Sequence, residues 1–353
     1  MTAWRVALLY NLKANVPLDT GAPDDALAEY DSVETVQGLE DALRAGGHQV
    51  IPLEADETLL DTIRQAAPDI CFNIAEGLRG DAREAQVPAL LEMLGIPYTG
   101  SQVLAHALSL DKAATKRIWR DVGLPTAPFQ VFQRQDEPLL PGLAFPLFVK
   151  PLREGSGMGI NSRSVVGDER ALREQARWVI RTYRQPALVE AFLSGREFTV
   201  GILGNTLAPG ERPPAALYDE RGFHTLPLLE IDVSPVAEAG GLYTSHVKSD
   251  HPLAPNYLCP APVDDALAQE LRRLAVAAFE AIGALDVARV DFRMGSDGQP
   301  YLLEINTLPG LNPTYSDIVM AARAEGMSYT TLVNEILHLA ARRYGLRDGL
   351  ADG

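Results

Sequence analysis

The first hundred residues alternate short apolar runs with segments whose apolar residues recur at helical spacing, and no other feature limits the possible folds as much. The predicted strands cover residues 4–10, 48–53, 69–74 and 96–98. The helices predicted between them cover residues 31–45, 57–66 and 84–94. Strands that alternate with helices in this way build a parallel sheet, and such a sheet binds ligands at the carboxyl ends of its strands.

The first of these helices is predicted to begin at Asp31, because Asp31 and Glu34 have the spacing of a capping box. The glycine pair at 46–47 would end the helix. Its predicted apolar face consists of Val33, Val36, Leu39 and Leu43.

Beyond residue 102 the pattern is mixed, which predicts an α/β fold at the front of the chain and an α+β fold behind it. Helices are predicted at residues 111–122, 168–183, 264–282 and 328–343. Strands are predicted at residues 128–133, 146–151, 160–166, 187–191, 197–204, 286–294 and 300–306. Residues 205–262 are rich in proline and glycine and have few periodic segments, which is typical of a functional or mobile loop.

Length and charge limit the classes of function. At 353 residues the chain is too long for one compact core, so two or three domains are expected. Its 46% hydrophobic and 22% charged residues are typical of a globular enzyme. With 31 basic residues against 47 acidic ones, the net charge of −16 repels phosphate backbones and anionic lipids. We therefore expect neither a nucleic acid nor a membrane as a partner.

Two further features predict a cytoplasmic protein. The N-terminal run MTAWRVALLY lacks the basic leader and the cleavage site of a signal peptide, and no stretch has the length of a membrane span. Cys71 and Cys259 are the only cysteines, which argues against a disulfide framework.

The strongest chemical signal lies at residues 284–310, where two strand-like runs flank the turn sequence GSDGQ. If the turn centres near Asp297, Asp291 faces Glu304 and Arg289 faces Asn306. Because side chains alternate across a strand, these four polar residues would share one face. The core residues predicted for the other face are Val290, Phe292, Leu303 and Ile305.

This polar face has the groups of a magnesium site. Two carboxylates and an amide oxygen suffice for Mg²⁺ when phosphate oxygens supply the remaining ligands. Arg289 is placed to stabilise a developing anion, and the following sequence NTLPG turns backbone N–H groups toward the same corner. The alternative is a solvated hairpin whose Asp and Arg form a surface ion pair.

Two further segments indicate a phosphate-bearing ligand. Lys150 ends an apolar strand and is followed by EGSGMG, where a glycine loop brings backbone N–H groups and the Ser156 hydroxyl to phosphate oxygens. Neither a Walker motif nor a dinucleotide fingerprint is present, and an ordinary hairpin turn is the alternative. Lys112 and Lys116 lie on the first turns of a helix that opens at Asp111, where exposed lysines are the simpler interpretation.

A third segment contains Glu190 at the end of an apolar strand and Glu197 at the start of the next. Such an edge strand can offer its backbone to an adenine, and a following carboxylate can bind ribose hydroxyls. In isolation, a structural role is equally consistent with this segment.

In this order, the segments resemble the ATP-grasp superfamily, and within it the D-alanine–D-alanine ligase family, over about residues 68–343. The resemblance is carried by REAQVPALLEMLGIPYTGS, ALSLDKAATK, VKPLREGSGMGI, LVEAFLSGREFTV, ARVDFR and LLEINTLPGLNP. It implies an ATP-dependent ligase, in which a carboxylate is phosphorylated to an acyl phosphate and an amine then attacks to form a peptide or amide bond. The implied cofactors are ATP and two Mg²⁺ ions, with Mn²⁺ as a substitute.

The resemblance also implies roles for individual residues. The ATP-binding residues would be Lys112, Lys150, Glu154, Gly155, Ser156, Gly157, Glu190, Ala191, Leu193 and Glu197. Asp291, Glu304 and Asn306 would hold the metal ions. The catalytic groups would be Arg289, the backbone N–H of Gly310, and Ser156 near the transferred phosphoryl group. Substrate-binding residues would be Glu76, Arg289, Gly310, Tyr315 and Ser316.

The substrate end departs from the family pattern. The glycine pair and the Ser-x-Glu segment after the first strand are absent, so Glu29, Glu34 or Glu76 is left to bind an amino group. Glu76 stands in FNIAEG where the family has a histidine, and Lys248 replaces a loop lysine that reaches the γ-phosphate. These departures predict a ligase with an altered amino-acid-like substrate. The alternatives are a genuine D-alanine–D-alanine ligase of peptidoglycan precursor synthesis and a catalytically silent nucleotide-binding protein.

Three domains follow from the resemblance. Residues 1–102 would form a substrate domain, residues 103–195 a central ATP-grasp lid and residues 196–353 the C-terminal ATP-grasp domain. A loop at 235–260 would cover the site and exclude water. The family resemblance implies a homodimer.

Overall fold

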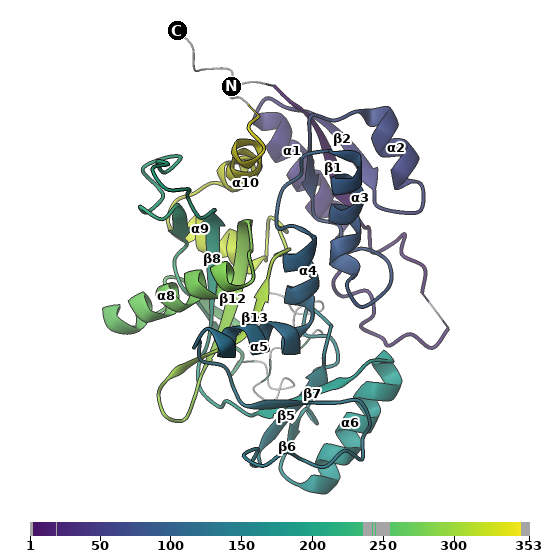
Figure 1. Ribbon diagram of the computed structural model, residues 1–353, viewed down its shortest axis with the longest axis vertical. Coiled ribbons are helices and arrows are strands. Elements are labelled where there is room, and N and C mark those ends of the chain that lie inside the picture. The colour runs from purple at the N-terminus through teal and green to yellow at the C-terminus, as the bar shows by residue number, and fades with distance from the viewer. Residues whose placement is uncertain (1–2, 19, 236–241, 243, 245–254, 347–353) are drawn as a thin grey trace.

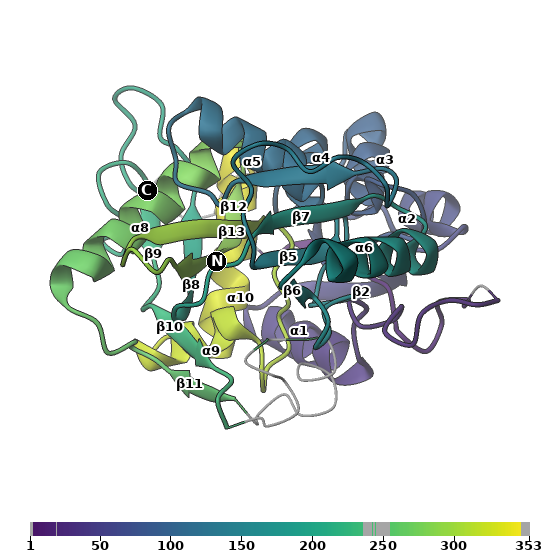
Figure 2. The same cartoon turned by 90° about the horizontal axis from the view of Figure 1, so that it is seen from below.

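Three sheets organise the part of the chain that the computed structural model describes, which comprises residues 3–18, 20–235, 242, 244 and 255–346. The first sheet and the second lie toward opposite ends of the long axis of the molecule, as Figure 1 shows. Seen from below, the second sheet and its helix lie beside the third sheet (Figure 2). Among these residues no helix is long and apolar enough to cross a membrane.

The first sheet is parallel, as predicted, with strand order β2-β1-β3. Its strands are β1 (Arg5–Tyr10), β2 (Gln49–Glu54) and β3 (Ile70–Asn73). The accompanying helices are α1 (Val33–Ala45), α2 (Leu59–Ala66), the 3₁₀ turn η1 (Arg83–Ala85) and α3 (Gln86–Leu94). The strand predicted at 96–98 is reduced to a single bridge between Cys71 and Tyr98.

The predicted start of α1 is wrong. Ser32 caps the helix, because its hydroxyl accepts a hydrogen bond from the Thr35 N–H at 3.3 Å. Asp31 instead forms a parallel bridge with Leu12, which holds its backbone in an extended conformation. Val33 is consequently 67% exposed and does not face the core. The Asp31 carboxylate is thereby left free of any capping role.

The second sheet is antiparallel, with order β4-β7-β5-β6, and α6 (Glu169–Tyr183) packs on it. Its strands are β4 (Phe129–Phe132), β5 (Leu147–Pro151), β6 (Val165–Val166) and β7 (Ala187–Ala191). The strand predicted at 160–166 keeps only its last two residues. Asn161 and Ser164 form a turn there, because the Asn161 side chain accepts from the Arg163 N–H and the Ser164 hydroxyl accepts from the Asn161 N–H.

The third sheet is also antiparallel, with order β11-β10-β8-β12-β13 and β9 beside β8. Its strands are β8 (Glu197–Gly204), β9 (Phe223–Thr225), β10 (Leu229–Asp232), β11 (Asn256–Leu258), β12 (Asp286–Met294) and β13 (Pro300–Asn306). Helices α5 (Lys112–Asp121) and α8 (Asp265–Ala281) pack against it. The short strands β9, β10 and β11 fall in the segment 205–262, where the sequence pattern predicted few elements.

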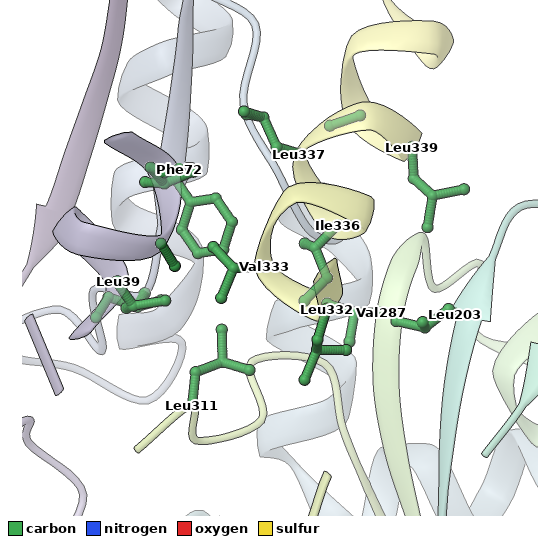
Figure 3. Packing of buried hydrophobic residues seen from close by; sticks show 14 of the residues in the cluster. Leu39, Phe72, Leu203, Val287, Leu311, Leu332, Val333, Ile336, Leu337 and Leu339 are labelled. Atoms are coloured by element: carbon green, nitrogen blue, oxygen red, sulfur yellow. The ribbon is translucent and has the colours of Figure 1, made fainter. Parts of the chain in front are cut away.

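Helix α10 (Tyr329–Arg343) joins the first and third sheets into one core. Figure 3 shows Leu332, Val333 and Ile336 of this helix between Phe72 of β3 and Val287 of β12. Each fully buried aliphatic side chain contributes about 1.5–3 kcal/mol. The helices α4 (Val103–Leu110) and α9 (Asp317–Ala324) complete the fold and had not been predicted. The domain boundaries near 102 and 195 stay predictions.

Candidate active site

The hairpin of β12 and β13 has the predicted register, with Arg289 opposite Asn306 and Asp291 opposite Glu304. A bulge follows, because Phe292 pairs with Leu302 instead of Leu303. Leu302 therefore takes the core position and is fully buried, while Leu303 lines a cavity together with Glu304. The prediction that Leu303 packs in the core is wrong for this reason.

Arg289 is held between two carboxylates. Its Nε and Nη2 atoms donate to Asp291 at 2.9 Å each, and its Nη1 lies 3.2 Å from Asp317 Oδ2. Burial lowers the pKa of the Arg289 guanidinium, but Asp291 and Asp317 outweigh it, so this pKa is raised above its ordinary value. Asp317, the first residue of α9, was not predicted as a site residue. The only sequence feature that could have indicated a role for Asp317 is its position as an acidic residue after a proline- and glycine-rich segment.

The residues predicted to hold metal offer hard oxygen ligands on one side of the hairpin. The Thr199 hydroxyl donates to Asp291 Oδ1 at 2.6 Å, and Asn306 Oδ1 accepts from the Leu308 N–H at 2.9 Å. Among the described residues, no three His, Cys, Asp or Glu side chains group in a way that could hold a metal alone. Two carboxylates with one amide oxygen suit Mg²⁺ or Mn²⁺ that shares its other ligands with phosphate oxygens.

Three buried charges lie beside this hairpin, Glu190 on β7, Lys150 on β5 and Lys116 on α5. Glu190 Oε1 lies 2.8 Å from Lys150 Nζ, and Glu190 Oε2 lies 3.0 Å from Lys116 Nζ. Burial raises the pKa of Glu190, but the two lysines outweigh burial and lower this pKa to about 2. Burial lowers the pKa of Lys116, whereas Glu190 and Glu304 raise that of Lys150. The interpretation of Lys112 and Lys116 as exposed surface lysines is wrong, since both are buried.

A first cavity brings together most of the residues predicted to bind a nucleotide. Its lining includes Lys112, Lys150, Glu154, Gly157, Glu190, Ala191, Leu193, Glu197, Arg289, Asp291 and Glu304. Lys112 Nζ lies 3.4 Å from Glu304 Oε2 and donates to the Glu154 carbonyl oxygen at 2.5 Å. Arg293 also lines this cavity, 3.5 Å from Glu197, and had not been predicted. Gly155 and Ser156 do not line the first cavity, and Lys248 lies outside the described residues, as does most of the predicted cover at 235–260.

The glycine loop at 154–159 is held by side chains of the N-terminal region. Arg83 donates to both carboxylate oxygens of Glu29, at 2.6 and 2.7 Å, and also to Glu154 at 2.9 Å. Asp25 accepts from the Gly159 N–H at 2.8 Å and from the Tyr183 hydroxyl. These contacts tie the loop to residues far away in the sequence, which explains why local patterns did not predict Arg83 or Asp25 as site residues.

A second cavity, of about 230 Å³, adjoins the first and shares Arg289 and Asp317 with it. Its lining brings together the predicted substrate residues Glu76, Arg289, Gly310, Tyr315 and Ser316, along with Asn306 and Ser156. Glu29, Tyr30 and Asp31 line the side toward the first sheet. Glu34 does not line it, because its carboxylate accepts from the Thr314 hydroxyl at 2.9 Å.

The chain is similar to proteins of one family. A family model described as D-ala D-ala ligase C-terminus matches residues 118–338. A D-alanine–D-alanine ligase of Bordetella petrii is 36% identical over 314 residues, which are 88% of this chain and 87% of that protein. An uncharacterised protein of Sinorhizobium fredii is 38% identical over 311 residues, 86% of each chain.

The fold agrees with these sequence relationships. A crystal structure of the D-alanine–D-alanine ligase from Bacillus anthracis complexed with ATP superposes with a TM-score of 0.73, and the match covers 97% of this chain and 99% of that one. The two sequences are 21% identical, so this similarity concerns the fold. Together with the family model and the closer relatives, it shows that the chain belongs to the D-alanine–D-alanine ligase family of ATP-grasp proteins.

Proposed function

We propose that this protein is an ATP-dependent ligase that joins a carboxylate to an amine through an acyl phosphate. The observation that supports this most directly is the junction of the two cavities at Arg289. A nucleotide in the first cavity and a substrate carboxylate in the second would meet at this residue. Family membership and the ATP-bound state of the Bacillus anthracis relative are consistent with ATP as the phosphoryl donor.

The first cavity would bind ATP. Lys112 and Lys150 would contact its phosphates, and the backbone of Ala191 and Leu193 would contact the adenine beside Glu190. Glu197, held by Arg293, would bind the ribose hydroxyls. Asp291, Glu304 and Asn306 would hold Mg²⁺, which neutralises phosphate charge when bound.

The second cavity would bind the acyl donor. A carboxylate oxygen of the acyl donor would attack the γ-phosphorus of ATP and form a new O–P bond. The bond between the γ-phosphorus and the bridging oxygen would break, and ADP would leave with its electron pair. The amine then attacks the acyl carbon, a C–N bond forms, the nitrogen loses a proton and phosphate leaves. Arg289 and the Gly310 N–H would stabilise the negative oxygen of the tetrahedral intermediate.

Phosphate release from Mg-ATP, measured with D- and L-amino acids singly and in pairs, tests this function. We expect release only when a suitable acyl donor and amine are present, together with a condensed product detected by mass spectrometry. D-Alanine alone yielding its dipeptide would identify a genuine D-alanine–D-alanine ligase. Binding of ATP without phosphate release for any pair would contradict the ligase proposal and leave a nucleotide-binding protein.

The contacts of Arg83 predict an effect on nucleotide binding. Arg83→Gln leaves Glu29 and Glu154 facing each other without the guanidinium between them, so the loop at 154–159 is expected to move away from the nucleotide. We expect the KM for ATP to rise about tenfold with a smaller change in kcat. Arg79→Gln, an exposed neighbour with the same change of charge, is the control. Equal KM values for the two variants would rule out this role for Arg83.

A further inference from the structure

The second cavity contains two carboxylates that have no hydrogen-bond or ion-pair partner among the residues the structure describes. They belong to Asp31 and Glu76. The other two acidic residues that line the cavity are paired, Glu29 with Arg83 and Asp317 with Arg289. Lys13 is the remaining basic residue of the lining, but it is exposed, so water and salt screen its charge.

Local structure accounts for the position of both carboxylates beside this cavity. The backbone bridge between Asp31 and Leu12 keeps Asp31 outside the first turn of α1. Glu76 lies just beyond the carboxyl end of β3, where a parallel sheet binds its ligands. Asp31 ends the loop that follows β1 and Glu76 begins the loop that follows β3, so both residues lie at the carboxyl edge of the first sheet and line the same cavity.

Burial makes the ionised forms of these two groups unfavourable. Burial raises the pKa of Asp31 to about 7. Burial, followed by the charges of Glu84, Glu29 and Asp31, raises the pKa of Glu76 well above its ordinary value, and the charge of Arg83, which is paired with Glu29 and Glu154, lowers it only in part. Both side chains are half-buried in the cavity wall, and a partly desolvated carboxylate is stabilised by pairing with a cation, so the missing partners are expected to come from a ligand.

The same cavity contains Arg289 and the Gly310 N–H, where the proposed function places the reacting carboxyl group. An amino acid bound there through its carboxyl group carries one α-ammonium, which can pair with one of the two carboxylates. A neutral side chain would leave the other carboxylate without a cation beside it. A side chain that ends in an amine or a guanidine would supply the second charge.

We propose that the acyl-donor substrate is a dibasic amino acid, whose α-ammonium and cationic side chain pair with Asp31 and Glu76. This inference rests on the proposed ligase function, because it uses the same cavity. It differs from that function in predicting a preference for a second positive charge that ligation itself does not require.

The test compares lysine, ornithine and arginine with the neutral norleucine and norvaline, in both enantiomers, as substrates for phosphate release. We expect kcat/KM for the cationic amino acids to exceed that for neutral ones of similar length by about 10- to 100-fold. Asp31→Asn and Glu76→Gln are both measured, and at least one is expected to abolish this preference. Asp24→Asn, which removes an exposed carboxylate outside the cavity, should retain it.

Two results separate this inference from the proposed function. Turnover with neutral amino acids at the same kcat/KM as with dibasic ones, or a preference unchanged in both variants, would overturn the inference and leave the ligase intact. If no amino acid supports turnover, the ligase proposal fails, and calorimetric binding of lysine and norleucine in the presence of Mg-ATP decides the inference. Tighter binding of lysine that Asp31→Asn or Glu76→Gln removes would support it, and equal binding would overturn it.

Discussion

Replacing Glu304 by glutamine is expected to lower kcat for phosphate release about 100- to 1,000-fold, the size of effect seen when one charge-stabilising group is lost from an active site. Glutamine keeps the shape of the side chain but removes the negative charge from the oxygen pair that faces the first cavity. Asp291 and Glu304 are the two carboxylates of the hairpin proposed to hold the metal, so Glu304→Gln removes one of its two anionic ligands. Steady-state phosphate release at saturating ATP measures the change.

The magnesium dependence of the same variant gives an independent measurement. A weakened metal site should shift the half-saturating Mg²⁺ concentration upward, whereas a general loss of folding would not. Asp297→Asn is the matched control, because Asp297 lies exposed in the turn of the same hairpin and accepts hydrogen bonds there from the Gln299 N–H and the Tyr301 hydroxyl. It should stay within about twofold of the parent protein. Unchanged turnover in Glu304→Gln would exclude this residue from the metal site.

The hairpin also shows which parts of the site sequence reasoning can predict. Two strand-like runs around a turn rich in glycine and aspartate determine a register, and the alternation of side chains then determines which of them share a face. The pairs of Arg289 with Asn306 and of Asp291 with Glu304 followed from this alone. The bulge at Leu303 did not, because no special residue marks it, and both Leu302 and Leu303 suit a core equally well.

Local sequence patterns could not predict the contacts that hold the site together. Arg83 bonds Glu29 and Glu154, which are 54 and 71 residues away in the sequence. Lys116 shares the buried carboxylate of Glu190 although its helix has the periodicity of a surface element. Asp317 reaches Arg289 from a helix that was not predicted. In each case tertiary packing decides the environment of a charge whose sequence neighbourhood is ordinary.

Glu190→Gln is expected to destabilise the folded protein by about 3–5 kcal/mol, because it leaves two buried lysines without their shared counter-charge. Lys116 and Glu190 are almost fully buried, so water cannot replace the lost ion pair. Urea denaturation at neutral pH, followed by circular dichroism, measures the effect as a lower midpoint. Glu270→Gln is the control, since Glu270 pairs with Arg273 on an exposed helix face and should contribute less than about 1 kcal/mol.

The pH dependence of the stability difference between the parent protein and Glu190→Gln shows whether the charge of Glu190 causes that difference. The folded-state pKa of Glu190 is lowered to about 2 from an ordinary value of 4.5, so its ion pairs stabilise the protein above pH 4.5 and are lost as the pH falls toward 2. The difference in the free energy of unfolding between the parent protein and Glu190→Gln should therefore be largest at neutral pH and should decrease steadily as the pH falls below 4.5. A lost packing contact would give a difference independent of pH. A constant difference over this range would show that Glu190 stabilises the fold by its shape and not by its charge.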